Sequence, residues 1–174
     1  MKDSIRKLYS LFDHSANSLQ SVFLLAVRLY WGWQFAQTGW GKLHRLPQVV
    51  EFFSSLGIPA PAANAYFVSG LELVGGILLA IGLGGRIIAV PLTIDMLMAY
   101  PTADREALAS VFSDPGKFYN ADPFTFLMAS LIILIFGSGL FSVDALIARM
   151  WFKNSNTTVR SLQPVSEHKH AVNQ

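Results

Sequence analysis

The sequence predicts an all-α fold, a membrane-spanning four-helix bundle with short interfacial helices in the first outer loop and after the fourth crossing. The chain has 174 residues, of which 52% are hydrophobic and 14% are charged, whereas a typical soluble domain has about 25% charged residues. Its charges gather at the ends and in two loops, and long apolar runs lie between them. A chain of this length has room for one core.

The apolar runs define the expected crossings at residues 19–41, 62–83, 86–100 and 123–141. A helix needs about 20 apolar residues to cross a bilayer. The third run is short by that standard and reaches across only if residues 83–85 form a tight turn. We therefore expect a cytoplasmic N-terminal segment at 1–18, a transmembrane domain at 19–152 and a disordered cytoplasmic tail at 153–174.

The connections between the crossings contain shorter helices. Residues 47–56 form an amphipathic pattern that begins with Pro47 and can end at Gly57. Residues 105–112 hold one or two helical turns, and residues 142–152 continue the chain as an interfacial helix with Ser142 as its cap.

The distribution of basic residues predicts that both termini are cytoplasmic. Four crossings put eight basic residues on the side of the termini and four on the opposite side, which agrees with the positive-inside rule. The eight are Lys2, Arg6, Lys7, Arg86, Arg149, Lys153, Arg160 and Lys169, and the four are Lys42, Arg45, Arg105 and Lys117.

Composition excludes several kinds of function. The chain has no cysteine, so it has no disulfide and no thiolate metal site. No histidine lies in a crossing, which excludes a bis-histidine haem in the bundle, and we expect no metal site. No basic stripe is interleaved with aromatic residues, so nucleic acid is not an expected partner.

Three ionisable residues, Arg28, Glu72 and Asp95, lie inside the apolar runs. Charge in the hydrocarbon core is costly, so it persists where it is paired or used. At about 1.5 Å per helical residue, the three side chains lie ~13 to ~16 Å from the inner ends of their helices. We therefore expect Arg28 to meet Glu72, Asp95 or both.

Small residues predict close packing of the same helices. Gly76, Ala80 and Gly84 follow Glu72 at four-residue spacing, and Gly32 and Gly39 share the Arg28 face of the first helix. Such stripes let helices approach closely in lipid.

The charged cluster has two interpretations. It can line a ligand or proton site, or it can only fix helix register. Gln34 and Gln37 in the outer half of the first helix can bind a flat polar ligand such as a quinone head group, or can make interhelical hydrogen bonds. Lys42 at the outer mouth can attract an anion or can extend toward lipid headgroups.

Several motifs follow one another in a fixed order between residues 22 and 146. They are Arg28-Leu29, Gly39-Trp40-Gly41-Lys42-Leu43, Gly57-Ile58-Pro59-Ala60-Pro61, Glu72-Leu73-Val74-Gly75-Gly76, Gly82-Leu83, Asn120–Phe124 and Gly139–Asp144. In this order and spacing the chain resembles the DoxX family of small integral membrane proteins, which includes DoxD-like members. The resemblance implies a multi-pass protein of the bacterial cytoplasmic membrane, and it implies Arg28, Lys42, Glu72 and Asp144 as family positions.

The resemblance also implies a role in membrane redox chemistry. We expect the membrane subunit of a quinone-linked or thiol and oxidative-stress oxidoreductase assembly, whose electron carrier is a bound quinone or a partner redox enzyme. One alternative is a non-enzymatic membrane scaffold for soluble partners. Another is a small proton or solute transporter, which requires a homo-oligomer because four short crossings are few for alternating access.

Overall fold

The computed structural model describes residues 2–151, with the backbone alone for residues 2–18. The predicted tail at 153–174 lies outside the described residues. The described part is helical and contains no strand, which confirms the all-α prediction. Its elements are α1 (Lys2–His44), α2 (Leu46–Ser55), α3 (Pro61–Ile81), α4 (Gly85–Thr102), α5 (Arg105–Ala109), α6 (Pro115–Asn120) and α7 (Pro123–Phe136).

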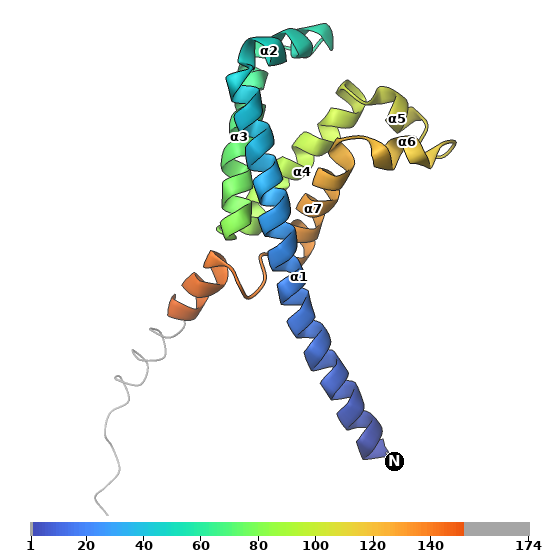
Figure 1. Cartoon of the computed structure of the whole chain (residues 1–174), viewed down its shortest axis with the longest axis vertical. Coiled ribbons are helices and arrows are strands. Elements are labelled where there is room, and N and C mark those ends of the chain that lie inside the picture. The colour runs from blue at the N-terminus through green and yellow to red at the C-terminus, as the bar shows by residue number, and fades with distance from the viewer. Residues whose placement is uncertain (1, 152–174) are drawn as a thin grey trace, which may run out of the picture.

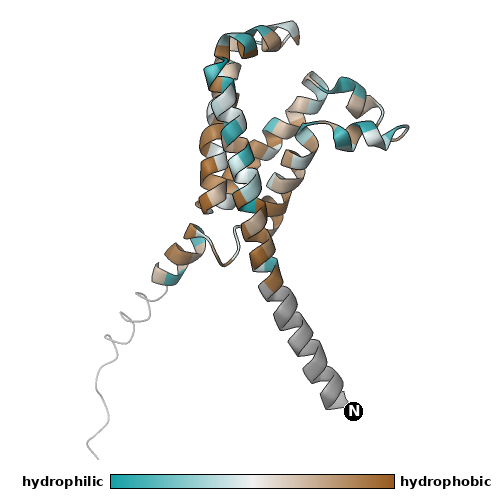
Figure 2. Cartoon of the chain, in the orientation of Figure 1, coloured by the Kyte–Doolittle hydropathy of each residue, from teal (hydrophilic) through white to brown (hydrophobic). Residues whose placement is uncertain are grey.

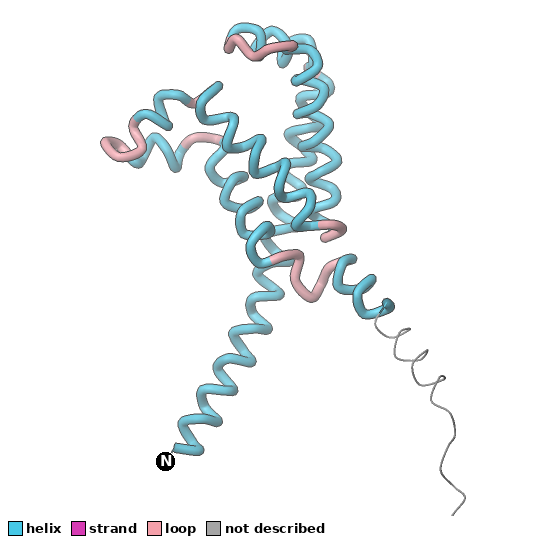
Figure 3. The backbone as a smooth tube through the Cα atoms, turned by 180° about the vertical axis from the view of Figure 1, so that it is seen from behind, coloured by secondary structure: helices cyan, strands magenta, loops and turns pink. Residues whose placement is uncertain are grey.

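The long helices form two antiparallel pairs. α1 packs along α3, and α4 packs along α7 (Figure 1). The pairs meet where α3 turns into α4 and diverge toward α2, α5 and α6, as the reverse view also shows (Figure 3). We name the end at residues 82–85 and 137–142 the turn end, and the end at α2, α5 and α6 the loop end.

Helix α1 starts much earlier than the sequence predicted. The expected crossing began at residue 19, whereas the helix begins at Lys2 and extends past the end of α3 (Figure 1). Residues 2–31 contain no glycine or proline, so nothing in the chain interrupts the backbone hydrogen bonds there. The turn end of the bundle therefore lies part-way along α1 and not at its start.

The last crossing is shorter than expected. The prediction ran to residue 141, but α7 ends at Phe136 because Gly137 (φ 81°) and Gly139 (φ 72°) take left-handed conformations. The backbone is helical again at 143–151, and the Ala145 amide donates to Ser142 Oγ at 3.1 Å. Ser142 therefore caps this segment as predicted.

Close contact between α1 and α3 depends on residues without bulky side chains. A Cβ on Gly32 would lie 2.7 Å from the Gly76 carbonyl oxygen and 2.7 Å from the Ala80 nitrogen. A Cβ on Gly39 would lie 2.6 Å from the Ser69 carbonyl oxygen. Gly84 does not belong to this contact, because it lies in the turn before α4 with φ 61° and no atom near its Cβ position.

Aromatic packing joins the two pairs. Phe126 of α7 contacts the rings of Phe35 (4.7 Å between centroids) and Trp31 (5.1 Å) on α1.

A hydrogen bond joins the two helices of the second pair. Thr93 of α4 donates to Ser130 Oγ of α7 at 3.0 Å, which satisfies two hydroxyl groups between these helices.

Hydropathy varies along the bundle. Apolar residues dominate the middle of the long helices, and polar residues cover α5, α6 and part of α2 (Figure 2). Among the described helices, α3 is long and apolar enough to cross a bilayer, and α7 is apolar but has only 14 residues. α1 and α4 are long enough but not apolar enough by the same measure, and they carry the charged residues Arg28, Lys42 and Asp95.

The α1–α3 contact makes a direct prediction. Gly39→Ala should lower the free energy of unfolding by about 1–3 kcal/mol, because the added methyl group meets backbone atoms of α3. Gly41→Ala is the matched control, since no atom lies within 4 Å of its Cβ position, and it should be neutral or stabilising by up to about 1 kcal/mol. Denaturant unfolding of the full chain in detergent measures both, and equal effects would contradict the packing.

Candidate functional site

The structure separates the three charges that the sequence analysis placed together. Arg28 lies at the turn end, opposite Gly82, the residue that follows α3. Glu72 lies about ten residues farther along α3, which corresponds to ~15 Å of helix. The expectation that Arg28 meets Glu72 or Asp95 is therefore wrong. It failed because it measured the depth of Arg28 from residue 19, while α1 continues well beyond the bundle.

Arg28 instead binds the backbone that follows α7. Its side chain is buried, with Nη1 donating to the Ser138 carbonyl and Nη2 donating to the Phe141 carbonyl at 2.6 Å. Gly82 is required beside it, because a Cβ there would overlap the guanidinium group. A guanidinium with fixed donors suits this task, since its two terminal nitrogens bind separate carbonyls, while Nε is buried without a partner in the described part of the chain.

Asp144 closes the same turn end from the other side. Its carboxylate accepts from the amides of Gly84 (2.7 Å) and Gly85 (3.0 Å) and from Ser138 Oγ (2.9 Å). These amides open α4 and have no partner within the helix. Arg28, Ser138 and Asp144 thus form a turn-end clamp, which holds the α3–α4 turn against the segment after α7.

The environment of Asp144 sets its pKa. Partial burial raises the pKa, but the hydrogen bonds from Gly84, Gly85 and Ser138, together with the charge of Arg28, bring it below its ordinary value.

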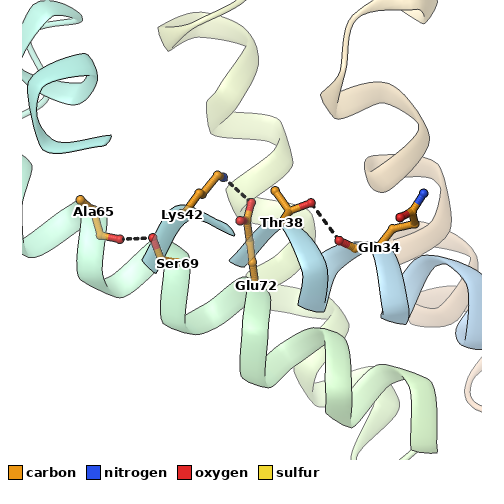
Figure 4. A network of polar contacts seen from close by, with 6 residues as sticks. All are labelled: Gln34, Thr38, Lys42, Ala65, Ser69 and Glu72. Atoms are coloured by element: carbon orange, nitrogen blue, oxygen red, sulfur yellow. Dashed lines mark hydrogen bonds and ion pairs between the residues drawn. The ribbon is translucent and has the colours of Figure 1, made fainter. Parts of the chain in front are cut away.

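A second polar centre lies in the loop-end half of the α1–α3 pair. Lys42 Nζ donates to Glu72 Oε1 at 2.7 Å (Figure 4). The side chain of Glu72 is 2% exposed and that of Lys42 is 30% exposed. The carboxylate is therefore inside the protein, and its cation reaches it from the surface.

Asp95 of α4 belongs to this centre. It lies within electrostatic reach of both Glu72 and Lys42. Glu72 Oε2 and Asp95 Oδ2 are buried and have no hydrogen-bond partner in the described part of the chain. Buried polar atoms are nearly always paired, so two such oxygens in one place indicate a site that takes a proton or a ligand. We name Lys42, Glu72 and Asp95 the loop-end centre.

The glutamines predicted as ligand residues are not part of the loop-end centre. Gln34 is half-buried and its side chain points away from the Lys42–Glu72 pair, while its carbonyl accepts from Thr38 Oγ1 at 2.8 Å (Figure 4). Gln37 lies on an exposed face of α1. Neither side chain makes a hydrogen bond within residues 19–151.

Sequence reasoning did not pair Lys42 with Glu72, and it missed the contacts of Asp144. The glycines carried a usable signal, because placing Gly32 opposite Gly76 and Ala80 puts Lys42 within one turn of Glu72. The same alignment puts Arg28 opposite Gly82. For Asp144, the signal was the Gly84-Gly85 pair, which opens a helix with free amides.

A comparison with known protein families confirms the resemblance drawn from the motif order. The model of the DoxX family matches residues 23–105, which contain Arg28, Lys42, Glu72 and Asp95. Residues 23–105 belong to the DoxX family. Proteins of this family are membrane-associated, so a lipid bilayer is the expected surroundings of this chain.

One relative extends the comparison beyond that region. The chain is 27% identical over 134 residues to a protein of Bacillus subtilis (strain 168) named "Putative oxidoreductase CatD", across 77% of this chain and 92% of that protein. No solved structure matches the chain.

The turn-end clamp predicts a pH dependence. The folded-state pKa of Asp144 is lower than its value of about 3.9 in the unfolded chain. The unfolded chain therefore binds more protons as the pH falls. The clamp contributes its full share to the free energy of unfolding above that unfolded-state pKa. Its contribution is lost as pH falls through the folded pKa. Asp144→Asn should cost about 1–3 kcal/mol at pH 7 and should remove this part of the acid sensitivity. Unfolding curves between pH 2.5 and 7 measure it, and parallel curves for both proteins would contradict the assignment.

We expect strong energetic coupling between Lys42 and Glu72, because they form the ion pair of the loop-end centre. Lys42→Met leaves Glu72 buried and unpaired, and should cost up to about 3 kcal/mol. The double variant with Glu72→Met should recover much of that loss, because no charge remains buried. A double-mutant cycle on the free energy of unfolding measures the coupling. Additive single effects would mean that the ion pair is absent.

Proposed function

We propose that this chain is the membrane subunit of an oxidoreductase assembly and that its loop-end centre exchanges protons with a bound quinone. The observation that carries the proposal is the pair of buried, unpartnered carboxylate oxygens on Glu72 and Asp95 beside Lys42. The family and the printed name of the Bacillus subtilis relative support the redox assignment.

The donor set fits a quinone head group. Reduction of a quinone to a quinol adds two electrons and two protons. If Lys42 turns from Glu72 to a quinone carbonyl oxygen, Glu72 loses its counter-charge and can hold a proton, and Glu72 and Asp95 can then each supply one proton to the quinone. The two electrons come from a partner redox enzyme. Arg28 lies at the turn end, where its donors bind the Ser138 and Phe141 carbonyls, so Lys42 takes the charge-stabilising role in this proposal.

The topology follows from the same proposal. We place both termini on the cytoplasmic side of the bacterial inner membrane, with α1, α3, α4 and α7 as the four crossings. The basic residues near the turn end then face the cytoplasm, in agreement with the positive-inside rule.

Quinone retention tests the proposal. The full chain, purified from bacterial membranes and extracted with solvent, should yield bound quinone. Lys42→Met and Glu72→Gln should weaken quinone binding about 10-fold to 100-fold, because each removes a charge-assisted hydrogen bond or its orienting partner. Glu51→Gln is the matched control, since Glu51 is an exposed acid on α2.

Three results would contradict this function. The folded wild-type chain could carry no quinone, or Glu72→Gln could retain it fully. A third is proton flux through liposomes without quinone that Glu72→Gln abolishes, which would identify a transporter instead.

A further inference from the structure

A groove lies beside the loop-end centre, between the last turns of α1 and the first half of α2. Its volume is about 440 Å³. The lining side chains include Thr38, Lys42, Arg45, Gln48, Val49 and Phe52. The lining therefore combines polar and charged side chains with the apolar side chains of Val49 and Phe52.

The groove is positively charged. Lys42 and Arg45 line it, and none of its lining residues is acidic. Within residues 19–151 the Arg45 guanidinium has no hydrogen-bond or ion-pair partner. An unpaired guanidinium next to a lysine is suited to an oxyanion, because its planar donors match carboxylate and phosphate oxygens.

Lys42 belongs to the groove and to the loop-end centre at the same time. Its Nζ contacts Glu72 Oε1 at 2.7 Å, while its stem remains partly exposed at the groove. Lysine has a flexible four-carbon stem and rotatable donors, so a small rotation can turn its ammonium from one anion to another. An anion in the groove therefore competes with Glu72 for the same cation.

We infer that this groove binds a phosphate-type oxyanion, carried by a lipid headgroup or free in solution, and that binding draws Lys42 away from Glu72. Arg45 holds the anion with Lys42, and Gln48 can donate a further hydrogen bond. For a lipid, Val49 and Phe52 contact the first carbons of the chains.

Anion binding in the groove changes the surroundings of Glu72 in the loop-end centre, and this consequence rests on the proposed function. Without Lys42, neither oxygen of Glu72 has a hydrogen-bond donor, and the charged group that remains in reach is Asp95 of α4. A buried carboxylate without a counter-charge takes a proton and becomes neutral. The groove then regulates when Glu72 holds a proton for transfer.

Direct binding to the full chain in detergent tests the inference. The probes are inorganic phosphate, dihexanoyl phosphatidylglycerol and, as a control that lacks the phosphate group, dihexanoyl glycerol. We expect Arg45→Gln to weaken binding about tenfold, since it removes one charge-assisted contact. Lys117→Gln, which changes another loop-end cation outside the groove, should have no effect. Glu72→Gln should tighten binding, because it releases Lys42 from its internal partner.

The probes distinguish the sources of the anion. Binding of phosphatidylglycerol without binding of phosphate identifies a lipid headgroup, and equal binding of both identifies a soluble oxyanion. No binding of either, or an unchanged affinity in Arg45→Gln, overturns the inference. An unchanged affinity in folded Glu72→Gln overturns the sharing of Lys42.

Proton uptake in weakly buffered solution tests the coupling. Wild type should take up protons when the anion binds, and Glu72→Gln should not. All of these measurements are made without quinone, so their failure leaves the proposed function standing. Loss of quinone retention, in turn, leaves the anion result unchanged.

Discussion

The close contact between α1 and α3 determines where Arg28, Lys42 and Glu72 lie relative to one another. Gly32 and Gly76 bring the two backbones together, so the register between the helices cannot slide without a clash. This register puts Arg28 opposite Gly82 and Lys42 near Glu72. The pairing of charges is therefore a consequence of packing between residues that have almost no side chain.

The two polar centres that result have different characters. At the turn end, Arg28 and Asp144 use most of their hydrogen-bonding atoms on backbone groups, which is the arrangement of a structural clamp. At the loop end, Glu72 and Asp95 keep unpartnered oxygens inside the protein, beside a lysine that reaches the surface. Arg28 Nε at the turn end is also unpartnered, but the loop-end oxygens lie beside a lysine that reaches the surface, and such a centre is where exchange with a ligand is expected.

The sequence predicted the fold class, the short α2 helix and the Ser142 cap, because these depend on local patterns of apolar residues, proline and glycine. It also identified Arg28, Glu72 and Asp95 as candidates, because charge among apolar residues is visible without a structure, and it named Lys42 for its place at the outer mouth. The pairing was not predictable from depth alone, since hydropathy did not show that α1 continues beyond the bundle. The conformations of Gly137 and Gly139, which end α7 early, depend on contacts that form only in the folded chain.

The ion pair between Lys42 and Glu72 is the central claim of this account, and solid-state NMR can measure it in lipid. The chain would carry ¹⁵N in the lysine and arginine side chains and ¹³C in the glutamate carboxyl groups. We predict a strong dipolar coupling from a lysine Nζ to a glutamate carboxyl carbon, which disappears in Glu72→Gln. A coupling between Glu72 and the guanidinium nitrogens of Arg28, with none from lysine, would contradict the register and the centre built on it.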